Sequence, residues 1–344
     1  KRRGDLLTRT KALAEELLSN PSGFACEELG EDVAVYTHIS TGELFVEKKV
    51  RDHEFEVMQY LASQKIDGIS RIAQCQVGED GYILFSPYYG QTLQEMLEDG
   101  KRFSLEEVRH IGEKVLTILN KLHSLGIIYG DLKTTNVCYD PITKQVTLID
   151  FGLTYSIEEV YDDVLIQSTS HRDIRRIFEC PLSTQNDVWS LGCLMHDLYA
   201  HRLLFPYSNI DDDGPKDLLF QAHMIEHKLG KFPAELITSA SRKQKKKLLR
   251  PGKIDKITGT LKPLSAEKFS AYRRIIEAEP TRADAKLLLA APLKGDSERD
   301  VLQLAQVISS CVRYSLDGPE ARPSPTELLE MDFFHPERFL LKAE

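Results

Sequence analysis

The sequence has little of what a secreted or membrane protein depends on. Its six cysteines lie far apart, form no CxxC pair and mostly occur in apolar contexts such as "NVCYD" and "LGCLM". This distribution argues against a disulfide framework or a zinc site and predicts reduced, buried thiols. No stretch approaches the eighteen apolar residues of a membrane helix, so we expect no membrane segment.

An excess of basic charge is also lacking. The 44 Lys and Arg residues against 53 Asp and Glu give a net charge of −9, so nucleic-acid binding has no global electrostatic basis, whereas a basic protein substrate is compatible with it. The sequence begins with Lys rather than Met, so we expect the natural N-terminus, and any targeting signal, to lie outside it. The expected location is cytoplasmic or nuclear, and we expect a monomer.

What is present is ample material for a core. With 344 residues and 42% hydrophobic content, the chain forms two domains or one large bilobal domain. Leucines at helical spacing over 5–19 predict an amphipathic helix within an N-terminal extension, 1–23. Strand patterns over 24–50 and 83–89, with a helical pattern over 53–63, then predict a small sheet with one helix, the lobe 24–88.

After Gly90 the sequence becomes mainly helical, which predicts a larger lobe over 89–340 and an α+β fold. Ser104 is the expected N-cap of a long helix that ends at Gly126, and a strand hairpin follows within 137–152. Helical spacing of apolar residues predicts further helices over 186–200, 216–228, 265–278, 299–314 and 324–331. The polar, irregular stretch 207–298 is expected to be an insert in this lobe.

The stretch "IIYGDLKTTNV" (127–137) precedes the hairpin, which ends in Asp150-Phe151-Gly152. Asp131, Lys133, Asn136 and Asp150 are, in this order, the residue types that phosphoryl transfer requires. Asp131 would accept or orient a hydroxyl proton and Lys133 would neutralise the transferring phosphate, while Asn136 and Asp150 would hold Mg²⁺. Each residue alone is compatible with an ordinary turn; the order and the strand context favour the functional interpretation.

From about residue 24 to 340, the sequence resembles the eukaryotic protein kinases. "ELFVEKKV" is similar to that family's third strand, so the resemblance implies that Lys48 contacts the α- and β-phosphates of ATP. "EFEVMQYL" resembles the family's C-helix, and its spacing favours Glu54 over Glu56 as the partner of Lys48. "NDVWSLGCLMHDLY" resembles the central helix of the large lobe, with Asp187 bracing the catalytic loop.

The resemblance also assigns residues around the nucleotide. "ILFSPYY" is similar to the gatekeeper and hinge, which makes Phe85 the gatekeeper and gives Ser86 and Tyr88 backbone contacts with adenine. "ELGEDVAVY" stands where the family has its glycine-rich loop, with Gly30 and Val35 as the expected nucleotide contacts. This loop is two residues short and lacks the second and third glycines, so weakened nucleotide binding is expected.

The stretch "IQSTSHRDIRRIFEC" resembles the dual-specificity tyrosine-regulated and homeodomain-interacting kinases, and "LLRPGKIDKITGTLKP" resembles the insert of SR-protein and CDC-like kinases. Gly130 replaces the Arg that in the family reads a phosphorylated activation segment, which predicts an active form without phosphorylation. The alternative is a phosphate on Tyr161 or Ser168 that is read by Arg172 or Arg175.

A further departure concerns the family's Ala-Pro-Glu motif, which is Asp173-Ile174-Arg175 here. Arg175 would face Arg322 and repel it, so either Glu179 replaces the missing carboxylate or the segment is rebuilt. The basic run 242–247 is either a solvated helix end or a nuclear localisation or docking patch.

Three functions are compatible with these features. The first is an ATP- and Mg²⁺-dependent kinase of Ser/Thr in proteins, because every chemically required residue is present. The second is a pseudokinase that binds or scaffolds, because the glycine-rich loop and two motifs have eroded. The third is a kinase-fold enzyme with a non-protein substrate, against which the complete large-lobe helices argue.

Overall fold

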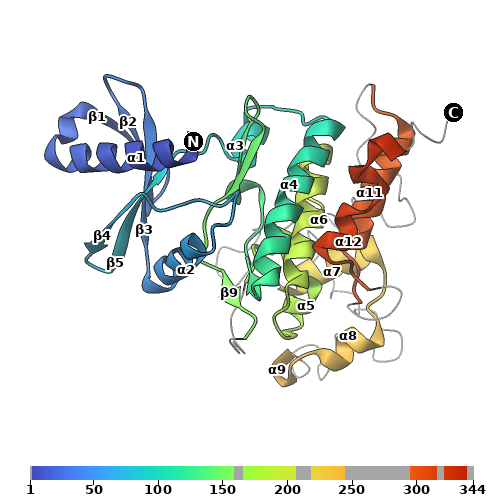
Figure 1. Ribbon diagram of the computed structural model, residues 1–344. Helices are drawn as coiled ribbons and strands as arrows, with labels where there is room; N and C mark the ends of the chain where they lie inside the picture. Colours follow the sequence, from blue (N-terminus) through green and yellow to red (C-terminus); the bar gives the residue numbers. More distant parts are fainter. Residues whose placement is uncertain (1, 159–165, 207–217, 245–294, 316–320, 339–344) are drawn as a thin grey trace, which may run out of the picture. The chain divides into compact units, whose positions relative to one another are not determined.

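The computed structural model describes residues 2–158, 166–206, 218–244, 295–315 and 321–338. The chain divides into two compact units, the first formed by residues 1–93 and 136–155 and the second by residues 94–135 and 156–344 (Figure 1). The activation-segment residues 159–165 and the expected helix 265–278, with most of the expected insert, lie outside the described residues.

The first unit contains a five-stranded antiparallel sheet of order β1-β2-β3-β5-β4. Its strands are β1 (Phe24–Glu28), β2 (Val33–His38), β3 (Leu44–Val50), β4 (Gln74–Gly78) and β5 (Gly81–Pro87). Helix α2 (Asp52–Ser63) connects β3 to β4, and the hairpin β7 (Val137–Asp140) and β8 (Gln145–Leu148) completes the unit. The two hairpins, the strand within 83–89 and the helix expected from the sequence are present, and β1 and β4 are additional strands.

Helix α1 (Arg2–Ser19) covers one face of this sheet (Figure 1). Its buried Leu13, Ala14 and Leu17 form a core cluster with Phe24, Phe45 and Phe85 of the strands. The Phe45 and Phe85 ring centroids lie 6.2 Å apart at an interplanar angle of 53°, a tilted contact that aromatic pairs favour. The amphipathic pattern over 5–19 therefore reflects burial against the sheet.

The second unit is mainly helical. Its longer helices are α4 (Leu105–Ser124), α6 (Gln185–Ala200), α7 (Leu218–Leu229) and α11 (Glu298–Cys311), and its shorter ones are α5 (Ile174–Ile177), α8 (Ala234–Ser239), α9 (Arg242–Gln244) and α12 (Pro325–Leu329). Helix α3 (Leu93–Glu98) belongs to this unit except for its first residue. Helix α4 begins with a capping box made by Ser104 and Glu107, and Gly126 follows its end with a φ of 70°. Both termini were predicted, since these residue types satisfy the free backbone groups at helix ends.

The cysteines fit the prediction only in part. All six are free, and Cys138, Cys180, Cys193 and Cys311 are buried, but Cys26 on β1 is exposed. The expectation of buried thiols is therefore wrong for Cys26, which lies on an edge strand, and Cys75 on β4 is only half-buried. Within the described ranges, no helix is both long and apolar enough to span a bilayer.

Candidate active site

Lys48 on β3 is bound by two carboxylates of the first unit. Its Nζ lies 2.6 Å from Oε1 of Glu54 on α2 and 2.9 Å from Oδ1 of Asp150. Glu54 is buried, whereas Glu56 is exposed. The partner of Lys48 is therefore Glu54, the residue that helical spacing favoured.

Burial and charge act in opposite directions on this group. Burial lowers the pKa of Lys48, but the Asp150 and Glu54 carboxylates outweigh it, so that the pKa is raised overall. Burial raises the pKa of Glu54, and the charge of Lys48 opposes that rise. A backbone N–H from Phe151 also donates to Glu54 Oε1, at 3.3 Å. Lys48 thus remains an ammonium ion at neutral pH, as a phosphate contact requires.

Asp150 and Asn136 lie on adjacent segments, because the Ile149 N–H donates to the Asn136 carbonyl at 3.0 Å. Asp150 has a φ of 61°, and its Oδ1 accepts from the Gly152 N–H at 3.2 Å. A Cβ on Gly152 would lie 3.3 Å from Glu54 Oε2, so glycine allows the close approach. A carboxylate and an amide oxygen are ligands that Mg²⁺ accepts, so Asp150 and Asn136 are the residues that would hold such an ion. Among the described residues, no group of three or more His, Cys, Asp or Glu side chains is placed to hold a metal.

The sheet register corrects the expected role of Phe85. Lys48 pairs with Leu84 across β3 and β5, and Val46 pairs with Ser86. Residues directly opposite in an antiparallel pair share a face, so Leu84 and Ser86 lie on the Lys48 face. Phe85 points to the other face and is buried against α1. Phe85 therefore does not lie on the Lys48 face, as the expected gatekeeper role requires, whereas the small, half-buried Ser86 does.

The remaining expected nucleotide contacts lie on β2, its preceding turn and the end of β5. Val35 pairs with Val46 and so shares the Lys48 face. Gly30 lies in the four-residue turn 29–32, which the Leu29 N–H closes by donating to the Val33 carbonyl at 2.9 Å. A Cβ on Gly30 would meet nothing within 4 Å, so this turn does not need glycine. Tyr88 is half-buried and directly follows β5.

In the second unit, Asp131 is held by three donors. The Ser168 N–H and Oγ donate to Oδ1 at 3.1 and 2.9 Å, and Lys133 Nζ lies 2.7 Å from Oδ2. Lys133 also donates to Ser168 Oγ at 2.9 Å. In the sequence Ser168 was expected only as a possible phosphate acceptor, so its contact with Asp131 was missed. The available signal was its place in "IQSTSHRDIRRIFEC", the stretch that resembles the dual-specificity tyrosine-regulated kinases.

The loop that carries Asp131 is fixed from α6. The backbone N–H groups of Tyr129 and Gly130 donate to the two oxygens of buried Asp187, each at 2.8 Å. His123 Nε2 lies 2.9 Å from Asp187 Oδ2. Gly130 has a φ of 83°, a conformation that glycine adopts without strain. Asp187 thus braces the loop, and Gly130 suits the backbone conformation there.

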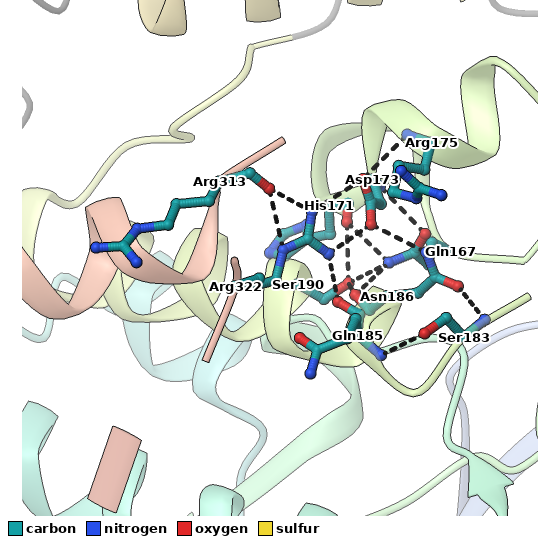
Figure 2. A network of polar contacts seen from close by, with 10 residues as sticks. All are labelled: Gln167, His171, Asp173, Arg175, Ser183, Gln185, Asn186, Ser190, Arg313 and Arg322. Atoms are coloured by element: carbon teal, nitrogen blue, oxygen red, sulfur yellow. Dashed lines mark hydrogen bonds and ion pairs between the residues drawn. The ribbon is translucent and has the colours of Figure 1, made fainter. Parts of the chain in front are cut away.

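The expected repulsion between Arg175 and Arg322 is wrong, because Asp173 is the partner of Arg322 (Figure 2). Arg322 Nη1 donates to Asp173 Oδ2 at 2.6 Å, and both side chains are fully buried. Asp173 also caps α5 by accepting from the Arg175 N–H at 3.0 Å. Glu179 accepts from Ser241 instead, at 2.6 Å. The segment is rebuilt around Asp173.

Arg172, which could have read a phosphate, is buried as well. Its Nη2 donates to the Gln167 carbonyl at 2.7 Å and its Nε to the Ile166 carbonyl at 3.4 Å. Burial lowers its pKa to about 10. The Arg172 guanidinium is thus already bound to backbone carbonyls in the interior. This argues against the alternative in which Arg172 binds a phosphate on Ser168. Tyr161 lies outside the described residues.

Comparisons with known proteins find similarity to protein kinases. The model of the protein kinase domain matches residues 30–334. Homeodomain-interacting protein kinase 1 of Mus musculus is 29% identical over 221 residues, 59% of this chain and 17% of that protein. Dual specificity tyrosine-phosphorylation-regulated kinase 4 of Homo sapiens is 36% identical over 159 residues, 45% of this chain and 29% of that protein. The matches thus span less than a third of each relative's length. The chain belongs to the protein kinase domain family, with its two-lobed α+β fold.

Proposed function

We propose that this chain is an ATP- and Mg²⁺-dependent protein kinase that transfers the γ-phosphate to Ser or Thr of a protein substrate. The observation that carries the proposal is the position of Lys48 Nζ, within 2.9 Å of both Glu54 and Asp150. These two contacts support nucleotide chemistry because they hold the Lys48 ammonium ion beside Asp150, a potential metal ligand.

The proposed roles follow from the side chains. Asp131 orients or accepts the proton of the substrate hydroxyl, and Lys133, 2.7 Å from its Oδ2, neutralises the transferring phosphate. Asn136 and Asp150 hold Mg²⁺, which neutralises charge on the phosphates during transfer. The expected partner is a protein substrate of basic character, which the net charge of −9 would attract.

Independence from activation-segment phosphorylation is part of the proposal. Gly130 supplies no cation for a phosphate, and Arg172 is committed to the backbone carbonyls of Ile166 and Gln167. Asp131 is already held by Ser168 and Lys133 without any modification. We therefore expect an unmodified chain to be active, as a monomer in the cytoplasm or nucleus.

The second candidate is a pseudokinase that binds partners without turnover. The observation in its favour is the short turn 29–32, which lacks two of the glycines of the family's loop. Fewer backbone N–H donors for the phosphates weaken nucleotide binding, by about 1.5 to 3 kcal/mol for each charged hydrogen bond lost.

A transfer assay separates the two. The chain is incubated with γ-labelled ATP, Mg²⁺ and a basic protein, beside Asp131→Asn and Lys48→Met. An active kinase labels the substrate, and each variant loses most of this activity because the affected group acts in the transition state. Binding of Mg²⁺-ATP by the wild type without label transfer would instead establish the pseudokinase.

A further inference from the structure

Gln167 is a buried residue with an unusual backbone conformation. It is 2% exposed, and its φ of 69° lies in the left-handed region. For a residue other than glycine this conformation persists only when surrounding contacts hold it. Gln167 therefore needs an explanation in its contacts.

The side-chain amide is clamped to α6 and to the start of α5 (Figure 2). Nε2 donates to the Asn186 carbonyl and to Ser190 Oγ, both at 2.8 Å. Oε1 accepts from the Asp173 N–H at 3.1 Å. The nitrogen of the amide thus binds helix α6, and its oxygen binds Asp173, the partner of Arg322.

The backbone of Gln167 is fixed on both sides. Its N–H donates to the Gly130 carbonyl at 2.8 Å, and its carbonyl accepts from Arg172 Nη2 at 2.7 Å. The next residue is Ser168, whose N–H and Oγ donate to Asp131. The torsion angles of Gln167 therefore determine where both donors of Ser168 point.

We propose that Gln167 is a positioning residue for Asp131. Its clamped amide keeps residue 167 in the left-handed conformation, and this conformation aims Ser168 at Asp131 Oδ1. The proposal rests on the proposed function, in which Asp131 acts on the substrate hydroxyl. Gln167 touches no reacting atom, so the effect passes through Ser168.

Two substitutions that differ by one methyl group separate positioning from packing. Gln167→Ala and Gln167→Gly both remove the clamp, but only alanine disfavours a positive φ. Positioning predicts that kcat falls about five- to thirtyfold in Gln167→Ala and about twofold in Gln167→Gly. The KM for ATP should stay the same, because Lys48, Asn136 and Asp150 belong to the other unit.

Packing predicts the reverse order, because glycine removes more buried volume and loses more chain entropy than alanine. Gln221→Ala is the matched control: Gln221 is also fully buried in this unit, but neither of its side-chain polar atoms has a hydrogen-bond partner among the residues that the structure describes. It should leave kcat unchanged. If Gln167→Ala does not fold, Gln167→Met replaces it, because methionine retains the side-chain volume. The kcat of Gln167→Met must then also be lower than that of Gln167→Gly.

Amide hydrogen exchange at Ser168 gives a readout that needs no activity. Exchange should be fastest in Gln167→Ala, intermediate in Gln167→Gly and at the wild-type rate in Gln221→Ala, because the Ser168 N–H loses Asp131 as acceptor. A kcat order that follows thermal stability, or unchanged exchange in Gln167→Ala, would overturn the proposal. If the wild type transfers no phosphate, the proposed function fails, and the exchange rates still decide the role of Gln167.

Discussion

Removal of the Asp173 carboxylate should be among the most destabilising single changes in the second unit. Asp173 and Arg322 are both fully buried, with Nη1 and Oδ2 2.6 Å apart. Breaking such a pair leaves an uncompensated buried charge and costs about 3–5 kcal/mol. Arg322 also donates to the carbonyls of Gln185 and Arg313, which favours the lower end, about 3 kcal/mol. Loss of the α5 cap adds about 1 kcal/mol.

These two contributions can be measured apart. Asp173→Ala removes charge and cap and should lower the free energy of unfolding by about 4 kcal/mol, whereas Asp173→Asn keeps a capping oxygen and should cost about 3 kcal/mol. Urea denaturation of both, of Arg322→Met and of the double variant Asp173→Asn/Arg322→Met gives the coupling. The double variant should lose much less than the sum of the single ones. Strict additivity, or a loss below about 1 kcal/mol in Asp173→Asn, would refute the buried pair.

Four further predictions concern the first unit, its nucleotide and phosphorylation. Phe85→Ala should lower the free energy of unfolding by about 3–5 kcal/mol, since Phe85 is 1% exposed beneath α1, whereas Ser86→Phe should leave stability nearly unchanged and weaken ATP binding in calorimetry; equal ATP affinities for Ser86→Phe and wild type would contradict the assigned faces. Glu54→Gln should lower kcat/KM about ten- to a hundredfold, and Glu56→Gln should not; similar losses in both would remove the special role of Glu54. ATP binding measured by calorimetry should require Mg²⁺ and vanish with EDTA; tight binding in EDTA would contradict the proposed metal dependence. Phosphatase treatment should change neither activity nor Tm; a large loss of activity after dephosphorylation would contradict independence from phosphorylation.

Much of the fold could be predicted because local physics determines it. Ser104 and Gly126 bound α4 through their own hydrogen bonds and backbone angles, and these preferences are visible in sequence. Strand β4 (Gln74–Gly78) was missed because its alternation of polar and apolar side chains covers only four residues before Gly78, and none of its residues is fully buried. Its place in the sheet depends on pairing with β5, which is not a local property.

The direction of Phe85 illustrates a second limit. The run Ile83, Leu84, Phe85 is apolar throughout, because α1 covers one face of the sheet and Lys48 occupies the other. A strand buried on both faces carries no alternation that would say which residue points where. The partner of Arg322 could not be predicted either. Asp173 lies 149 positions from Arg322 in the sequence, and the spacing of the motif pointed to residue 175 instead.

The most direct test of the account is single-turnover transfer of labelled γ-phosphate from Mg²⁺-ATP to a basic protein, with the phosphorylated residue located by mass spectrometry. The phosphatase-treated wild type should label Ser or Thr, and Asp131→Asn, which keeps the shape of the side chain, should be slower by several orders of magnitude. Unlabelled substrate with the folded wild type, or equal rates in the two proteins, would contradict the central claim.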